Sequence, residues 1–191
     1  MPQMAIGDKP YVVVSGLPGS GKSVLARRLA PLLNLPVIDK DDILERLFEA
    51  KGVRDAASRR ALSRESDEIL RQEALNSEGA VLVSFWHLAD MDHDSGTPTE
   101  WLRPLSSRVV TLHCICPPEI AADRFLARQR HPGHRDENRS KEDILASIRA
   151  ISQLGPLAIA PGIEVDTSRA EPDVEPIARE TIRLMNIRCT S

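Results

Sequence analysis

Aromatic residues, long apolar runs and excess charge of either sign are all scarce in this chain. Aromatics make up only 3% of the 191 residues, whereas single-stranded nucleic acid is bound largely by stacking on aromatic rings. The net charge of -3 offers little attraction to nucleic acid or to an anionic membrane surface. No apolar stretch approaches the ~20 residues that span a bilayer. We therefore expect neither nucleic acid nor a membrane as partner.

Cysteine is also sparse, with three residues in the chain. Cys114 and Cys116 stand two apart in an apolar run, so their side chains share one face of a strand. They are either a metal or redox pair or, as we favour, small buried side chains in a reducing cytosol. The opening residues 1–5 are neither basic nor apolar enough for a secretory signal, so we expect a cytoplasmic protein, monomeric or homodimeric.

One motif dominates the sequence: residues 16–23 match G-x-x-x-x-G-K-[ST] at every fixed position. A β-branched run, 11–14, precedes the motif and reads as a buried strand, and a helical pattern, 24–29, follows it. This is the context of a loop that wraps its backbone N–H groups around phosphate at a helix N-terminus. The residues expected to bind nucleotide here are Gly16, Leu17, Pro18, Gly19, Ser20, Gly21, Lys22, Ser23 and Val24.

Two side chains of this loop have defined chemical roles in such a site. Lys22 places a cation between the β- and γ-phosphates of ATP, and the Ser23 hydroxyl is placed to ligate Mg²⁺. The sequence therefore predicts ATP and Mg²⁺ as cofactors.

Strands and helices alternate along the rest of the chain. Strands are expected at 11–15, 35–38, 80–85, 108–116 and 162–166, and helices at 22–33, 43–48, 54–78, 117–130, 141–154 and 174–185. This alternation predicts an α/β domain with a parallel sheet and right-handed crossovers. We find no repeat or linker, so 1–191 is taken as one domain with its core at about 10–187.

The first helix should bury Val24, Leu25, Leu29, Leu32 and Leu33. Its proline, at position 31, costs roughly 3 kcal/mol in a helix interior, so we expect a kink or an end near residue 30. The last helix should bury a similar set: Val174, Ile177, Ala178, Ile182 and Met185.

Acidic residues follow the second expected strand, in the run Asp39-Lys40-Asp41-Asp42. Ligands bind at the carboxyl ends of strands in open parallel sheets, so these carboxylates are candidates for chemistry. The alternative is that Asp41 or Asp42 only caps the next helix.

Basic residues follow the fourth expected strand. Arg124 and Arg128 are four apart and are expected to share a helix face, and Arg130 precedes a Pro-Gly break. We interpret residues 130–140 as a lid; the alternative is a solvated basic face. The Asp- and His-rich loop 86–96 is read as a mobile polar loop near the substrate pocket, with metal binding left open.

The phosphate loop, the acidic run after the second strand and the arginine lid after the fourth strand together resemble the small P-loop kinases. These kinases have the nucleoside monophosphate kinase-like fold. That group includes gluconate kinase, chloramphenicol phosphotransferase and the AAA-domain or zeta-toxin-like small kinases. The resemblance covers about residues 10–187 and implies a three-layer P-loop NTPase fold, with a five-stranded parallel sheet in the order 2-3-1-4-5. It also implies transfer of the ATP γ-phosphoryl group to a hydroxyl or phosphate group of a small-molecule acceptor.

The resemblance assigns further roles by position. Asp41 would orient and deprotonate the acceptor hydroxyl, and Asp39 would help to hold Mg²⁺. Arg124, Arg128 and Arg130 would close over the phosphates, and Thr167 would lie beside the adenine. Which of the two aspartates is the base stays open.

One departure weakens the resemblance. Many P-loop enzymes end their third strand with an aspartate that holds Mg²⁺, whereas residues 83–86 read Val-Ser-Phe-Trp here. Two alternatives to a small-molecule kinase are therefore kept: a polynucleotide- or protein-directed kinase of the same fold, and an ATP-binding regulatory module without kinase activity. The acceptor is not identified by the sequence.

Overall fold

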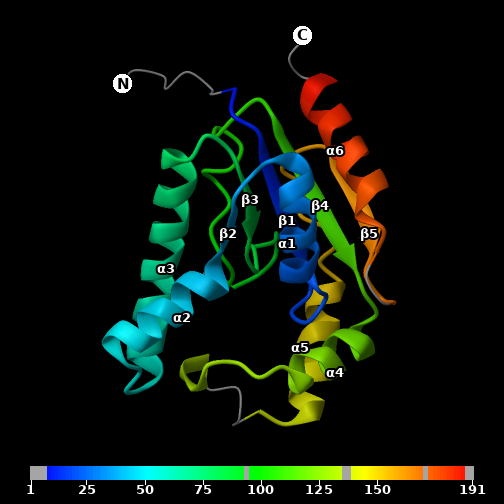
Figure 1. The fold of residues 1–191 in the computed structure, drawn as a ribbon. Coiled ribbons are helices and arrows are strands. Elements are labelled where there is room, and N and C mark those ends of the chain that lie inside the picture. Colours follow the sequence, from blue (N-terminus) through cyan, green and yellow to red (C-terminus); the bar gives the residue numbers. More distant parts are fainter. Residues whose placement is uncertain (1–7, 93–94, 135–138, 170–171, 188–191) are drawn as a thin grey trace.

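A parallel sheet of five strands, in the order β2-β3-β1-β4-β5, forms the centre of the molecule (Figure 1). The computed structural model describes residues 8–92, 95–134, 139–169 and 172–187. Each neighbouring pair of strands is parallel, as the alternation of strands and helices predicts. The strand order implied by the kinase resemblance is confirmed.

The strands lie close to their expected positions. They are β1 (Tyr11–Gly16), β2 (Val37–Asp39), β3 (Ala80–Val83), β4 (Val109–Ile115) and β5 (Gly162–Asp166). β1 is buried along its length between β3 and β4, except at its last residue.

Six α-helices and one short 3₁₀ helix are present in the described residues. They are α1 (Lys22–Leu33), α2 (Lys40–Lys51), α3 (Ala56–Asn76), α4 (Pro118–Ala127), η1 (Pro132–His134), α5 (Lys141–Ser152) and α6 (Val174–Ile187). None of the described helices is long and apolar enough to cross a membrane.

The two faces of the sheet are covered by different helices (Figure 1). Successive strand residues point to opposite faces, so Val13 packs with α2 and α3, while Val12 and Val14 pack with α1 and α6. A third apolar cluster joins α4 and α5 to the phosphate loop through Leu17. The phosphate loop is therefore supported from both sides, by the sheet and by α4.

The first helix does not end early at its proline. α1 continues through Pro31 to Leu33 and is capped by Asn34 in the left-handed conformation. Pro31 lies in the last turn, and the N–H that it lacks removes one hydrogen bond to the carbonyl four residues earlier without ending the helix. The expected inward face is also partly wrong: Val24 is 50% exposed and Leu32 39%, while Ala26 and Ala30 are buried instead.

The predicted inward face of the last helix is wrong at one position. Ala178 and Met185 are buried as expected, whereas Ile182 is 42% exposed and its neighbour Thr181 is fully buried. The Thr181 hydroxyl donates a hydrogen bond to the Ile177 carbonyl at 2.7 Å. This bond satisfies the hydroxyl within the helix and allows a polar side chain to take the inward position.

Candidate active site

The phosphate loop lies at the carboxyl end of β1, between the sheet and α4. Its glycines at 16, 19 and 21 all have positive φ angles, which bend the chain sharply from the strand into α1. Gly21 is itself the N-cap of α1, so the loop leads directly into the positive end of the helix dipole. The local geometry predicted from the motif is present.

Gly19 is the loop position with the least room for a side chain. A Cβ atom there would lie 2.1 Å from the carbonyl oxygen of Ala121 in α4, and φ is +81°. We expect Gly19→Ala to push the loop away from α4 and to weaken ATP binding at least tenfold in a calorimetric titration. Gly52→Ala is the matched control, because φ is +69° but nothing lies within 4 Å. Equal ATP affinity in both variants would contradict the expected role of this packing.

Lys22 is the first residue of α1, and its side chain folds back onto the loop. Its Nζ atom donates to the carbonyl oxygens of Gly16 at 3.0 Å and Leu17 at 2.8 Å. Burial lowers the pKa of Lys22, while Cys114, Asp41 and Asp39 act in the opposite direction. The ammonium group is thus positioned inside the loop with little water around it.

Asp39 ends β2 and caps α2, so the capping role that was the alternative for Asp41 or Asp42 belongs to Asp39. Its Oδ1 atom accepts from the Asp41 backbone N–H at 3.0 Å. Oδ2 is buried without a hydrogen-bond partner, although the Arg27 guanidinium lies 3.8 Å away. Burial raises the pKa of Asp39, and a hydrogen bond with Ser23 opposes this shift.

Ser23 and Asp39 suit a magnesium ion. Both offer oxygen atoms, Asp39 has one buried oxygen with no hydrogen-bond partner, and a cation would offset the burial that disfavours its charge. Mg²⁺ is usually held by one or two protein oxygens together with phosphate oxygens and water. Among the described residues, no three His, Cys, Asp or Glu side chains form a metal site, so the phosphates and water would supply the other ligands.

Asp41 lies in the first turn of α2, with 45% of its side chain exposed. Its Oδ2 atom accepts a hydrogen bond from Arg130 Nη2 at 2.9 Å. Burial alone would raise the pKa of Asp41, but Arg130 and other cations lower it overall. Asp41 is therefore an ionised carboxylate that faces open space, whereas Asp39 is enclosed.

Arg128 does not share a helix face with Arg124, contrary to the sequence prediction. α4 ends at Ala127, and Arg128 has an extended backbone. Its guanidinium carbon lies 5.3 Å from the centre of the Phe125 ring, and that of Arg130 lies 5.7 Å from the same ring. The ring thus brings Arg128 and Arg130 together by cation–π contact.

Arg124 is held by the loop after β5. It donates to the carbonyl oxygens of Thr167 at 2.6 Å, Ser168 at 3.0 Å and Arg169 at 3.2 Å. Thr167 is buried and lies beside Gly21 of the phosphate loop. The arginine therefore fixes the segment expected to lie beside the adenine, a contact that helical spacing does not reveal.

One open groove of about 920 Å³ contains these side chains. Val24 lines it as expected, together with Lys22, Asp41, Arg128 and Arg130. Among the other lining residues, His134 and Arg139 belong to the expected lid, whereas sequence reasoning missed Glu45, Arg59, Ser63 and Ser84. Nothing in their local sequence distinguishes them from surface residues, because chain segments far apart bring them together.

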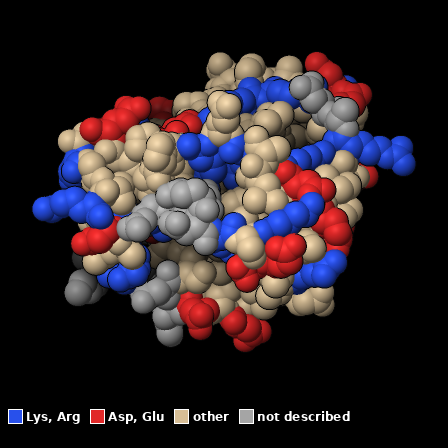
Figure 2. All heavy atoms as spheres, turned by 90° about the horizontal axis from the view of Figure 1, so that it is seen from below, with Lys and Arg blue, Asp and Glu red and all other residues tan. Residues whose placement is uncertain are grey.

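Figure 2 views the end of the molecule that carries α4 and α5. Basic and acidic side chains alternate across this face, and among the atoms coloured there neither sign forms one continuous surface. This distribution agrees with the small net charge and does not favour a polynucleotide partner.

A carboxylate is linked through Thr97 to Ser84, the residue that follows β3, although the strand itself carries none. Asp67 of α3 accepts a hydrogen bond from Thr97 Oγ1 at 2.6 Å, and Thr97 Oγ1 lies 2.5 Å from Ser84 Oγ. Lys40 Nζ lies 2.6 Å from the same Asp67 oxygen. The network places Ser84 at the edge of the groove.

We expect Asp67→Asn to lower the free energy of unfolding by about 2 kcal/mol, the range for hydrogen bonds to charged groups. Its ion pair with Lys40 is largely enclosed, at 17% and 13% side-chain exposure. Glu68→Gln is the control, since its partner Arg71 is on the same exposed helix face. Urea denaturation measures both; an equal effect of the two substitutions would show that the network does not stabilise the fold.

The expected lid and the acidic loop are described only in part. η1 packs His134 onto α2, where His134 Nε2 lies 3.0 Å from Glu45 Oε1, but residues 135–138 lie outside the described residues. The lid therefore stays a prediction. In the loop 86–96, His87 Nδ1 lies 2.7 Å from the Ser95 carbonyl oxygen, and His93 and Asp94 lie outside the described residues.

Cys114 and Cys116 are both buried and free, in agreement with the favoured interpretation of these residues as small buried side chains. Burial raises the pKa of the Cys114 thiol to about 11, which leaves it protonated and unreactive.

The family model described as an AAA domain matches residues 12–145, well over half of the chain. The chain therefore belongs to this AAA-domain family. Its fold is that of the small P-loop kinases, as the sequence resemblance implies.

Curated relatives match over part of the chain. A shikimate kinase from Corynebacterium glutamicum is 42% identical over 73 residues, which are 38% of this chain and 43% of the enzyme. An uncharacterised protein from Mycobacterium tuberculosis is 33% identical over 128 residues, which are 61% of this chain and 25% of that protein. The chain thus spans less than half the length of these two relatives.

Solved structures match over nearly the whole chain. A candidate kinase from Chloroflexus aurantiacus has a TM-score of 0.75 at 24% identity, covering 93% of this chain and 98% of that one. A gluconokinase from Sinorhizobium meliloti has a TM-score of 0.54 at 16% identity, covering 95% and 94%. At these identities the likeness supports the fold.

Proposed function

We propose that this protein is a kinase that transfers the γ-phosphoryl group of ATP to a hydroxyl group of a small molecule. The observation that carries the proposal is the shared groove: Lys22 of the phosphate loop and the half-exposed carboxylate of Asp41 line the same space. A cation for the phosphates and an acceptor for the hydroxyl proton are the two groups that phosphoryl transfer needs most.

The triphosphate would be held by the loop backbone and by Lys22. In the structure the Lys22 ammonium group occupies the mouth of its own loop, on the carbonyl oxygens of Gly16 and Leu17. These are weak partners compared with phosphate oxygens, so the ammonium would turn to the β- and γ-phosphates. Ser23 and Asp39 would hold Mg²⁺, which neutralises phosphate charge when bound.

Asp41 would act on the acceptor. The acceptor oxygen attacks the γ-phosphorus, the bond to the β,γ-bridging oxygen breaks, and ADP leaves with that oxygen. The hydroxyl proton passes to the Asp41 carboxylate and then to water. Because cations keep Asp41 ionised, the carboxylate is ready to align the hydroxyl before transfer and to accept its proton as the new bond forms.

Arg128 and Arg130 would neutralise the transferring group. Their guanidinium groups flank one ring, that of Phe125, and both line the groove. Arginine binds phosphate oxygens in a bidentate manner and stays protonated. Arg130 would exchange its contact with Asp41 for a phosphate contact when ATP is bound.

The relatives support a small acceptor without identifying it. The similar proteins include shikimate kinases and a gluconokinase. The acceptor therefore differs among proteins of this fold. The polynucleotide-directed alternative is not favoured. A cytoplasmic location is part of the proposal, because ATP and reduced cysteines are both found there.

The test mixes the protein with ATP, Mg²⁺ and a panel of small hydroxyl compounds. Acceptor-dependent release of ADP, with phosphate found on one compound, is the expected result. Slow hydrolysis that no compound changes would contradict the kinase proposal and would favour a nucleotide-binding regulatory module.

A further inference from the structure

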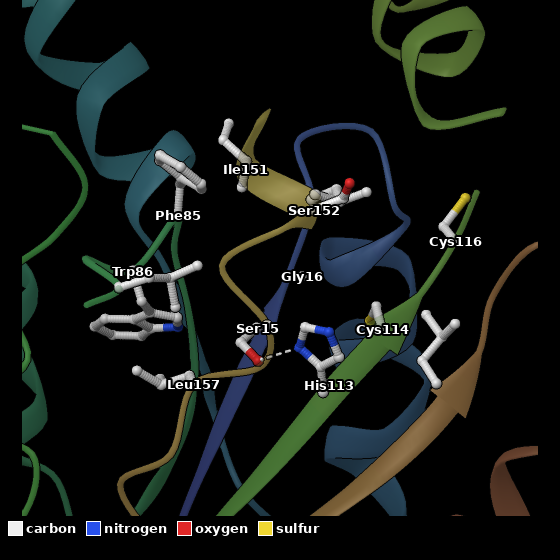
Figure 3. A pocket seen from close by; sticks show the side chains of 14 residues that line it. Ser15, Gly16, Phe85, Trp86, His113, Cys114, Cys116, Ile151, Ser152 and Leu157 are labelled. Atoms are coloured by element: carbon white, nitrogen blue, oxygen red, sulfur yellow. Dashed lines mark hydrogen bonds between the residues drawn. The ribbon is translucent and has the colours of Figure 1, made fainter. Parts of the chain in front are cut away.

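A separate cavity of about 210 Å³ lies against the phosphate loop and has no part in the mechanism above. Its walls come from the ends of β1 and β4, the segment after β3, and the end of α5 (Figure 3). Most of the lining side chains are apolar, including Phe85, Trp86, Leu88, Ile151 and Leu157. Such a space suits a compact hydrocarbon or aromatic group.

The cavity is built before any ligand arrives. Trp86 is only 2% exposed, and its indole N–H donates to the Val14 carbonyl oxygen at 2.8 Å. The ring is therefore fixed against the sheet by a buried hydrogen bond. A bound group would meet a rigid apolar wall and would lose little free energy to reordering.

One side of the cavity is polar, where Ser15 and His113 meet (Figure 3). Ser15 Oγ lies 3.0 Å from His113 Nδ1, which leaves Nε2 as the ring nitrogen for a bound molecule. Burial lowers the pKa of His113, so the ring is neutral near pH 7. Neutral imidazole offers a donor or an acceptor at Nε2, and a hydroxyl group pairs with either one.

The cavity also adjoins the groove of the proposed reaction. Phe85 and Ile151 line both spaces. Gly16 and Leu17, whose carbonyl oxygens accept from Lys22, form part of the cavity wall. A molecule with one hydroxyl beside Asp41 thus has an adjoining space in which to place its other end.

We propose that this cavity binds the apolar part of the phosphoryl acceptor, an inference that rests on the proposed kinase function. The acceptor is then an alcohol with a compact hydrocarbon or aromatic ring, which carries a second hydrogen-bonding group that reaches His113. An open-chain polyol fits poorly, because its hydroxyl groups would be buried against apolar walls without partners.

Binding is tested first without ATP, using 1,4-cyclohexanedimethanol as the probe and tryptophan emission as the signal. We expect a saturable change in the wild-type protein, because Trp86 lines the cavity. Ser152→Leu fills the cavity and should weaken binding at least tenfold. Gln153→Leu adds the same side chain at the next position, which is exposed and does not line the cavity, and should leave binding unchanged.

His113→Phe is the second variant, since it keeps a ring but removes the hydrogen bond. We expect it to weaken probe binding about two- to tenfold, the range for one neutral hydrogen bond. No saturable change in the wild-type protein, or equal binding by the Ser152→Leu and Gln153→Leu variants, would overturn the proposed subsite.

The acceptor role is tested with ATP and Mg²⁺ present. We expect phosphate transfer to the cyclic diol with a kcat/KM at least tenfold above that for xylitol, and a higher KM for the diol in Ser152→Leu with an unchanged KM for ATP. Preferred transfer to xylitol would overturn the acceptor class but leave the kinase function standing. Transfer to no compound, with the diol still bound, would instead remove the kinase function and the acceptor role with it.

Discussion

Lys22→Ala should abolish phosphoryl transfer and weaken ATP binding. Lys22 is the one lysine of the phosphate-binding motif, and its ammonium group lies within the loop on two carbonyl oxygens. Removing a single preorganised donor to a developing charge typically costs 10²–10³-fold in rate. A lysine on the β- and γ-phosphates also contributes to binding of ATP in the ground state. We therefore expect the loss in kcat/KM, measured by coupled ADP release, to exceed this range.

Lys51→Ala is the control for this substitution. Lys51 ends α2, is half exposed, and pairs with Glu65 at the surface. It should change neither ATP affinity nor turnover. The fold of the Lys22→Ala variant should be intact, because the hydrogen bonds that the Lys22 ammonium group makes among the described residues are with its own loop. An active Lys22→Ala enzyme would contradict the proposed function.

Asp41→Asn should retain ATP binding and lose transfer by ~10²-fold or more, the contribution of a general base. Asparagine keeps the shape of the side chain but cannot take the proton of the acceptor hydroxyl. Because the side chain faces the groove and is 45% exposed, the substitution should disturb the fold little. Single-turnover kinetics with ATP and an acceptor from the panel measure the transfer step.

Asp39→Asn should act differently. Asp39 is enclosed beside Ser23, so its loss should raise the Mg²⁺ concentration needed for half-maximal activity, with a smaller effect at saturating Mg²⁺. A magnesium titration of the two variants separates the roles. If Asp39→Asn reduces transfer more than Asp41→Asn does at saturating Mg²⁺, the two assignments are reversed.

Local patterns predicted most of the fold. A β-branched run indicates a buried strand, and β1 lies where the run 11–14 predicts it. Helix faces were less certain, because burial depends on what each helix meets. Val24 is exposed since it faces the groove and not the core.

The site was predictable where the chemistry depends on consecutive residues. The phosphate loop and the Asp39–Asp42 run are local features, and both lie where the motifs indicate. The partners of the arginines are not local: Arg124 reaches carbonyl oxygens 43 or more positions away. The link from Asp67 through Thr97 to Ser84 likewise joins three segments, and no single stretch of sequence carries its signal.

The most direct measurement is a calorimetric titration of the purified protein with a non-hydrolysable ATP analogue, with and without Mg²⁺. The structure predicts one site per chain, tighter binding when Mg²⁺ is present, and a large loss of affinity in Lys22→Ala. Absence of binding in the presence of Mg²⁺, or equal affinity of the wild-type and Lys22→Ala proteins, would contradict the assignment of residues 16–23 as the triphosphate site.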